Sequence, residues 1–133
     1  MTAATEGRNT KRRNAESVGH PVNAGNTVFA GTLVALLTAG GNAVPAGTAA
    51  SGDAVGVAES TVLGDGVQIV EARRGCFLFA NSLAGDQIAR ADIHGTAYVV
   101  DDQTVAKTDN TGVRKVAGKI IDVDATGVWV LVG

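Results

Sequence analysis

The sequence is poor in the residues from which disulfide-stapled domains, metal centres and membrane segments are built. It has one cysteine, Cys76, among 133 residues, which excludes an intrachain disulfide and a cysteine-cluster metal site. No apolar run approaches the roughly eighteen residues that span a bilayer. The polar start lacks the apolar segment of a signal peptide. We therefore expect a soluble protein that stays or assembles where it is made.

Aromatic residues and prolines are also scarce, with three Phe, one Tyr, one Trp and two Pro. The core must therefore consist of Val, Ile, Leu and Ala, which bury little area per residue. Glycine is abundant by contrast, at 18 residues, about twice the usual share, and this indicates frequent turns. The length fits one domain. Because a small, thin core gains stability from association, we expect this domain to form oligomers.

Charge is divided unevenly along the chain. Residues 1–17 hold four basic and two acidic side chains, a local charge of +2, whereas the remainder holds seven basic and eleven acidic ones, a local charge of −4. The segment has no apolar periodicity, so we predict an extended basic arm over residues 1–20 and a single ordered β-rich domain over 21–133. The basic side chains of the arm are Arg8, Lys11, Arg12 and Arg13.

From residue 21 onward, short apolar runs alternate with turn residues. This pattern predicts an all-β domain, a small β-barrel or β-sandwich of about eight to ten short strands. The segment from Asp86 to Ile93 predicts one short helix, with Asp86 as its cap. Pro45 places its run at a sheet edge. The other expected strands cover residues 27–30, 32–37, 43–46, 54–58, 67–72, 75–80, 96–100 and 104–106.

The last eighteen residues, Val116 to Gly133, are the most informative stretch. Two β-branched runs flank the connection Asp124–Gly127, which predicts a β-hairpin. Its second run is strongly apolar, and it requires a sheet or another subunit to cover it. Trp129 lies in the middle of that run, and burial in the core or between subunits is the expected use of so large a side chain.

Residue types that could support catalysis or metal binding occur without partners. His20 and His94 lack neighbours at ligand spacing, and we interpret both as loop residues. Cys76 lies in an apolar run and is expected to be a small buried hydrophobe. The acidic pairs Asp101-Asp102 and Asp122/Asp124 suit Ca²⁺ weakly, and turn formation explains them better. We predict no enzymatic activity, no cofactor, no metal and no small-molecule substrate.

The arginines of the domain suggest contacts with a protein. Arg73 and Arg74, with Arg90, would form an electropositive face on an acidic body. Nucleic-acid binding would require more basic residues and aromatic stacking groups. We therefore expect no nucleic-acid partner and no membrane partner, and we assign Arg73, Arg74 and Trp129 to a subunit interface. An ordinary solvated patch remains an equal interpretation of the arginines.

Several stretches together resemble a known family. They are Ala30–Leu36, Ala54–Glu59, Arg73–Phe77, Ala91–Ile93, Ala97–Val105, Val116–Asp124 and Gly127–Val130. In these stretches the chain resembles the capsid cement, or head decoration, proteins of tailed bacteriophages, over roughly residues 22–132. The basic arm is the least typical part.

The resemblance implies a β-rich, β-tulip-like structural protein without catalytic activity. Such proteins are often trimers on the outer surface of the virion, where they bridge major capsid protein subunits at threefold or local threefold sites. We expect the arm to reach the shell through Arg8, Lys11, Arg12 and Arg13. A receptor- or glycan-binding module of the virion surface is the alternative, and a small hydrolase using Cys76 or the histidines is a further one.

Overall fold

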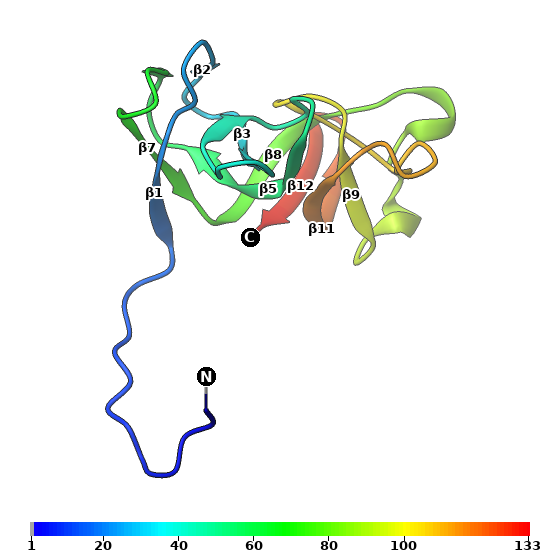
Figure 1. Cartoon of the computed structure of the whole chain (residues 1–133). Coiled ribbons are helices and arrows are strands. Elements are labelled where there is room, and N and C mark those ends of the chain that lie inside the picture. The colour runs from blue at the N-terminus through cyan, green and yellow to red at the C-terminus, as the bar shows by residue number, and fades with distance from the viewer. Residues whose placement is uncertain (1) are drawn as a thin grey trace.

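The computed structural model describes residues 2–133, which consist mainly of short β-strands (Figure 1). The predicted all-β class is confirmed. Between β8 and β9, the expected helical segment forms two single 3-10 turns, η1 (Ala84–Asp86) and η2 (Arg90–Asp92). No helix among residues 2–133 is both long and apolar enough to cross a bilayer. Within the same residues the strands are β1 (Ser17–Pro21), β2 (Thr27–Val28), β3 (Leu33–Leu37), β4 (Ala43–Pro45), β5 (Ser51–Ala58), β6 (Val62–Leu63), β7 (Ile69–Arg73), β8 (Gly75–Asn81), β9 (Thr96–Val99), β10 (Thr104–Ala106), β11 (Val116–Asp124) and β12 (Gly127–Val132).

The N-terminal half forms a five-stranded sheet in the order β1-β7-β5-β3-β4. An isolated bridge between Val22 and Ala43 links the segment after β1 to β4 and brings the two edges together. The short pair β2-β6 contributes Val28 and Val62 to the cluster of small apolar side chains that this sheet encloses. Pro45 lies on the edge strand β4, as predicted, where its missing N–H removes no hydrogen bond from a central ladder.

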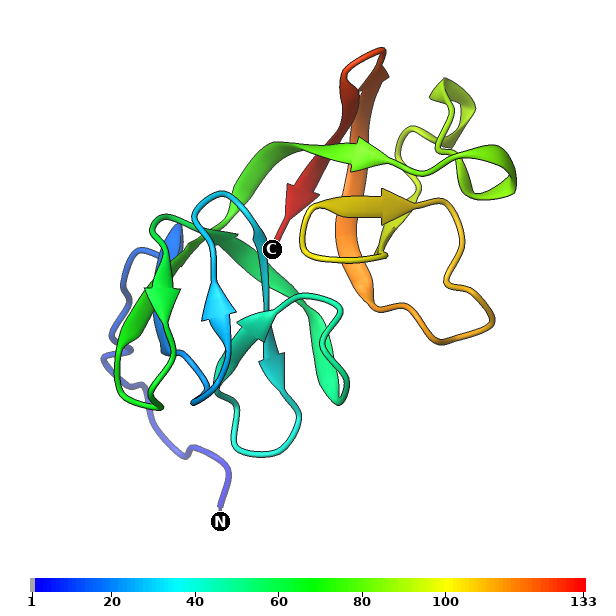
Figure 2. The same ribbon diagram turned by 90° about the horizontal axis from the view of Figure 1, so that it is seen from above.

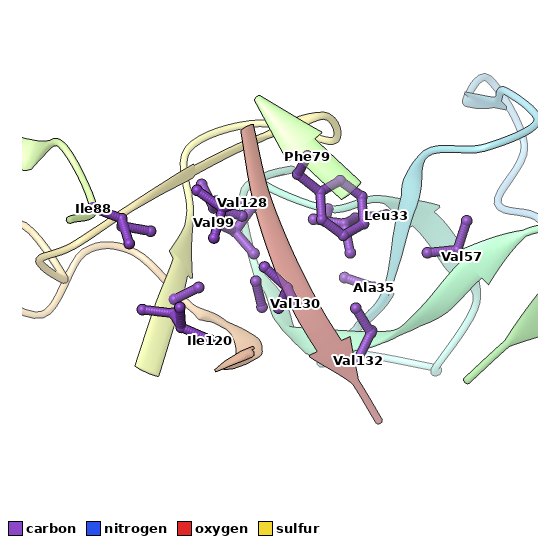
Figure 3. Close-up of a cluster of buried hydrophobic side chains, with 14 of the residues drawn as sticks. Leu33, Ala35, Val57, Phe79, Ile88, Val99, Ile120, Val128, Val130 and Val132 are labelled. Carbon is purple, nitrogen blue, oxygen red and sulfur yellow. The ribbon is translucent and has the colours of Figure 1, made fainter. Parts of the chain in front are cut away.

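The C-terminal half forms a closed barrel of β10, β8, β12, β11 and β9. The predicted terminal hairpin is present as β11 paired with β12. Val128, Val130 and Val132 alternate along β12 and are buried in one apolar cluster, which also contains Phe79 and Ile88 (Figure 3). Period-two alternation thus fills the interior with β-branched side chains, which pack well on a pleated surface.

The two halves are built around a shared core. Only Arg74 separates β7 from β8, so one nearly continuous length of chain passes from the sheet into the barrel (Figure 2). The larger apolar cluster includes Leu33 and Val57 of the sheet together with the barrel interior. Hydrogen bonds also cross the junction, because the amide of Leu33 donates to the Asp102 carbonyl at 2.8 Å.

The boundary between arm and domain differs from the predicted position. Pairing of β1 with β7 begins at Ser17, opposite Arg73, whereas the sequence placed the start of the domain at Pro21. The sequence includes residues 17–20 in the arm because the N-terminal segment is polar and charged and lacks apolar periodicity. These residues form a strand because they pair with β7, and pairing with a distant strand cannot be predicted from the local sequence pattern.

The loop that carries Ile88 into the barrel is held by one side chain. The amide of Asn81 donates to the Ile88 carbonyl at 2.8 Å, and its oxygen accepts the Ile88 N–H at 2.9 Å. Asp86, the expected cap, accepts instead from Thr108, while Asp92 accepts the Ala89 amide at 2.8 Å.

Replacement of Asn81 by Ala is expected to lower the free energy of unfolding by about 1–3 kcal/mol, because both backbone groups of the buried Ile88 lose their partner. Urea denaturation measures this loss. Asn9→Ala in the arm is the control and should leave the midpoint unchanged. An unchanged midpoint for Asn81→Ala would show that the loop finds other hydrogen-bond partners.

Candidate functional site

The arm, residues 2–16, extends from the domain without regular secondary structure (Figure 1). Every residue in this range is exposed, including the four predicted contact residues Arg8, Lys11, Arg12 and Arg13. None of these four forms an ion pair with another residue in 2–133. Their charges are therefore available to a partner.

A polar cluster fixes the point at which the arm leaves the domain. The amide of Arg74 donates to the Glu16 carbonyl at 2.7 Å. The Nε of Arg73 lies 3.5 Å from Glu16 and 3.4 Å from Glu59, and the Ser17 hydroxyl donates to Glu59 at 3.1 Å. Ion pairs this exposed contribute little stability, but together with the β1 pairing they set the direction of the arm.

The arginines predicted to lie at a subunit interface thus have partners inside the chain. Arg73 binds the root of the arm, and Arg74 donates from Nη2 to the Gly133 carbonyl at 2.9 Å. Arg90 donates to Asp122 at 3.0 Å, on β11 of the barrel. Because each guanidinium already has an acceptor within the chain, the three do not form the free electropositive face that the sequence suggested.

His20 lies on β1 opposite Val70, and not in a loop as predicted. Its half-buried position lowers the pKa of the imidazole, and the nearby Glu71 carboxylate partly opposes this effect. The folded protein therefore favours the neutral imidazole more than the unfolded chain does, so stability should fall as the pH drops through the ordinary pKa of 6.5.

His20→Gln is expected to flatten the loss of Tm between about pH 8 and pH 5.5, because glutamine cannot take up the proton. Thermal unfolding monitored by circular dichroism across this range tests the effect. Removing the opposing carboxylate with Glu71→Gln should steepen the same loss. If Tm falls equally with pH in His20→Gln and in the native chain, another titratable group causes the loss.

The outer surface of the barrel carries an apolar patch that the sequence did not predict. We call it the barrel face, and define it as the exposed side chains Cys76 and Leu78 on β8, Trp129 and Leu131 on β12, and Ile121 on β11. Leu131 lies opposite Cys76 and Trp129 opposite Leu78, so the patch comprises two rows across adjacent strands. A β-bulge after Ile120 turns Ile121 outward as well.

Two predictions are therefore corrected. Cys76 is exposed, because alternation along β8 turns Phe77 and Phe79 toward the interior instead. Trp129 is not a core residue, since 36% of its surface is exposed and its indole N–H donates to Asp124 at 3.2 Å. Its assignment to a subunit interface stays a prediction. Strands β8 and β12 have apolar residues on both faces. This departure from apolar–polar alternation is the feature of the sequence from which the outer patch could have been predicted.

An open groove of about 410 Å³ lies beside the barrel face. Leu78 and Phe77 line it together with Val57 and Ala58, and the ion pair of Arg73 with Glu59 also contributes. The groove therefore connects the barrel face to the root of the arm.

Asp101 and Asp124 stabilise turns, as predicted, whereas Asp122 lies on β11 and accepts from Arg90 instead. Asp101 accepts the Gln103 amide at 2.9 Å, and Asp124 accepts the Thr126 amide at 2.8 Å. Burial, and then the neighbouring Asp101, raises the pKa of Asp102. Among residues 2–133, no three His, Cys, Asp or Glu side chains are arranged to hold a metal ion.

The second histidine occupies a turn, as expected. His94 has a φ of +74°, a conformation uncommon for residues other than glycine. Its amide donates to the Ile120 carbonyl at 2.8 Å, so it joins η2 to the hairpin.

Comparisons of the chain with protein-family models, with curated proteins and with solved structures found no match. The geometry of the chain itself therefore supplies the support for a function.

Proposed function

We propose that this chain is a structural virion protein that binds the outer surface of a tailed-bacteriophage capsid and bridges neighbouring major capsid protein subunits. The observation that carries the proposal is the arm, which presents four unpaired basic side chains on an extended segment fixed at its root. Fifteen extended residues reach at most roughly 50 Å. That length is sufficient to cross from one subunit of a lattice to the next.

The domain serves as the rigid body from which the arm extends. Its two halves share one apolar core, so a force on the arm is carried through β1 and β7 into the barrel. Attachment at several points is stronger than any single contact through effective concentration. Three copies around a threefold or local threefold site therefore give firm attachment from individually weak arms.

Stabilisation of the shell follows from selective binding. A protein that binds the assembled lattice and not free capsid subunits shifts the equilibrium toward the assembled state by mass action. No chemical step by the decoration protein is required. The partner surface should be acidic, because the free charge of the arm is positive.

Mixing the purified protein with undecorated shells from the same phage, followed by sedimentation and image reconstruction, tests the proposal. We expect added density on the outer surface, in a fixed ratio to the capsid protein. Protein that remains in the supernatant at all shell concentrations would contradict the proposal.

The exposed indole of Trp129 favours a second candidate, a virion-surface module that binds glycans. A flat, exposed aromatic ring with a carboxylate beside it is a surface on which a sugar can stack. A glycan-array signal that disappears in Trp129→Ala would support this candidate over the structural one.

A further inference from the structure

Two charged residues of opposite sign lie on β11, at one edge of the barrel face, and each continues one of the two apolar rows. Lys119 is exposed and lies opposite Leu131, in the row that contains Cys76. Asp122 lies opposite Trp129, in the row that contains Leu78. Paired residues on neighbouring strands share a face, so one row ends in the cation of Lys119 and the other in the carboxylate of Asp122. Asp122 is ion-paired with Arg90, but the hydrogen bonds from Arg90 and from the Val123 amide both go to Oδ1, so Oδ2 can accept from a second cation.

From this arrangement we infer that the barrel face binds the barrel face of a second copy of the chain, across a twofold axis. The axis lies in the plane of the interface, perpendicular to the strands and midway between the two rows. Rotation by half a turn about it places Lys119 of each copy opposite Asp122 of the other. The same rotation lays Leu131 against Trp129. A patch that meets its own copy in this way forms an isologous interface, which only twofold symmetry produces.

Other occupants fit the face less well. The arm has no apolar residue larger than alanine between Thr2 and Glu16, so it would leave Trp129 and Leu131 in contact with water. A partner with charges of a single sign would attract the charged residue at the end of one row and repel the one at the end of the other. A second copy satisfies both, because it brings the same two charges in reversed order.

The contact is expected to be weak in solution. The barrel face consists of only a few apolar side chains in two rows, whereas stable complexes use roughly 20–30 residues on each side. Two such sheets pack about 10 Å apart. The pair should therefore be a minor species at micromolar concentration and become populated where copies are held close together.

On a shell, this pairing would join copies that belong to different trimers, a step that rests on the proposed function. Copies within one trimer are related by a threefold axis, across which a face does not meet itself. Neighbouring trimers meet across local twofold axes. The barrel face thus accounts for contacts between trimers, while the arm accounts for contacts with the capsid protein.

Sedimentation equilibrium of the purified full chain, from micromolar to millimolar concentration, tests the pairing without any shell. Variants are made in an Arg90→Gln background, so that a lysine at position 122 does not lie beside a cation. We expect a monomer–dimer equilibrium whose Kd rises at least about tenfold in Lys119→Glu. Asp122→Lys alone should act alike, and the double variant with both changes should restore the native Kd.

Lys115→Glu is the matched control, since Lys115 is exposed and lies outside the barrel face; its Kd should not change. Thermal unfolding of each variant separates lost pairing from lost folding. A chain whose mass does not change with concentration up to the millimolar range, or a double variant that pairs as weakly as the single ones, would overturn the inference. Because no shell is present, these outcomes do not depend on whether the arm binds capsid protein.

Discussion

Replacing Arg8, Lys11, Arg12 and Arg13 by glutamine is expected to weaken binding to undecorated shells by about a hundredfold or more. The four side chains are exposed and lack ion pairs within residues 2–133. Their charges therefore act on the partner alone. Each contributes a modest attraction, and the loss is multiplied when several arms attach together. Co-sedimentation over a range of shell concentrations measures the affinity.

Two controls distinguish charge from shape in this experiment. Exchange of the three arginines for lysine keeps the charge and should retain most of the binding, since no bidentate contact is required. Replacement of Thr2, Thr5 and Thr10 by alanine should change nothing. The native protein should also lose affinity as salt rises, because exposed charges are screened within about 10 Å at 0.1 M. Unaltered occupancy of the glutamine variant would remove the arm from the mechanism.

Gly118→Ala is expected to destabilise the domain by about 3 kcal/mol or more. A Cβ at this position would collide with the carbonyl oxygen of Leu131 on the neighbouring strand. Gly118 also follows the β-bulge at Val116, where β11 leaves its regular register with β9. The nearest atoms are backbone atoms of Leu131, which cannot rotate away as a side chain can, so the terminal hairpin must separate.

Gly85→Ala provides the matched comparison, because a Cβ there would meet no atom within 4 Å. Its midpoint in urea should remain within experimental error of the native value, while that of Gly118→Ala should fall sharply. Equal midpoints for the two variants would mean that β11 and β12 move apart at little cost. The barrel would then be less tightly packed than its buried valines indicate.

Local patterns in the sequence predicted the elements whose hydrogen-bonding partners are close in the chain. The hairpin of β11 and β12 and the pair β9-β10 were found because turn residues separate two alternating runs. β1 was missed, since its partner β7 lies about fifty residues away and its own pattern is weak. β6 was also missed, because its two residues pair with β2 at sequence separations of 34 and 36 residues, whereas β2 itself lies within the strand predicted over residues 27–30.

The same reasoning explains the errors about individual side chains. Cys76 was expected to be buried because its surroundings are apolar, and Trp129 was expected in the core or between subunits because its side chain is large. In strands that are apolar on both faces, composition does not indicate which face is inside. Closure of the barrel decides it, by turning Phe77, Phe79 and the alternate valines inward and leaving the barrel face exposed.

By itself, the amino-acid sequence determined the all-β class, the terminal hairpin, the turn roles of Asp101 and Asp124 and the separation of a basic arm from an acidic body. These depend on residue type and short-range spacing. Only the tertiary structure decided where β1 pairs, which arginines are engaged within the chain, and that apolar rows ending in Lys119 and Asp122 face outward. Those features arise from strand register between distant segments, which is set by packing of the whole core and not by any local run of residues.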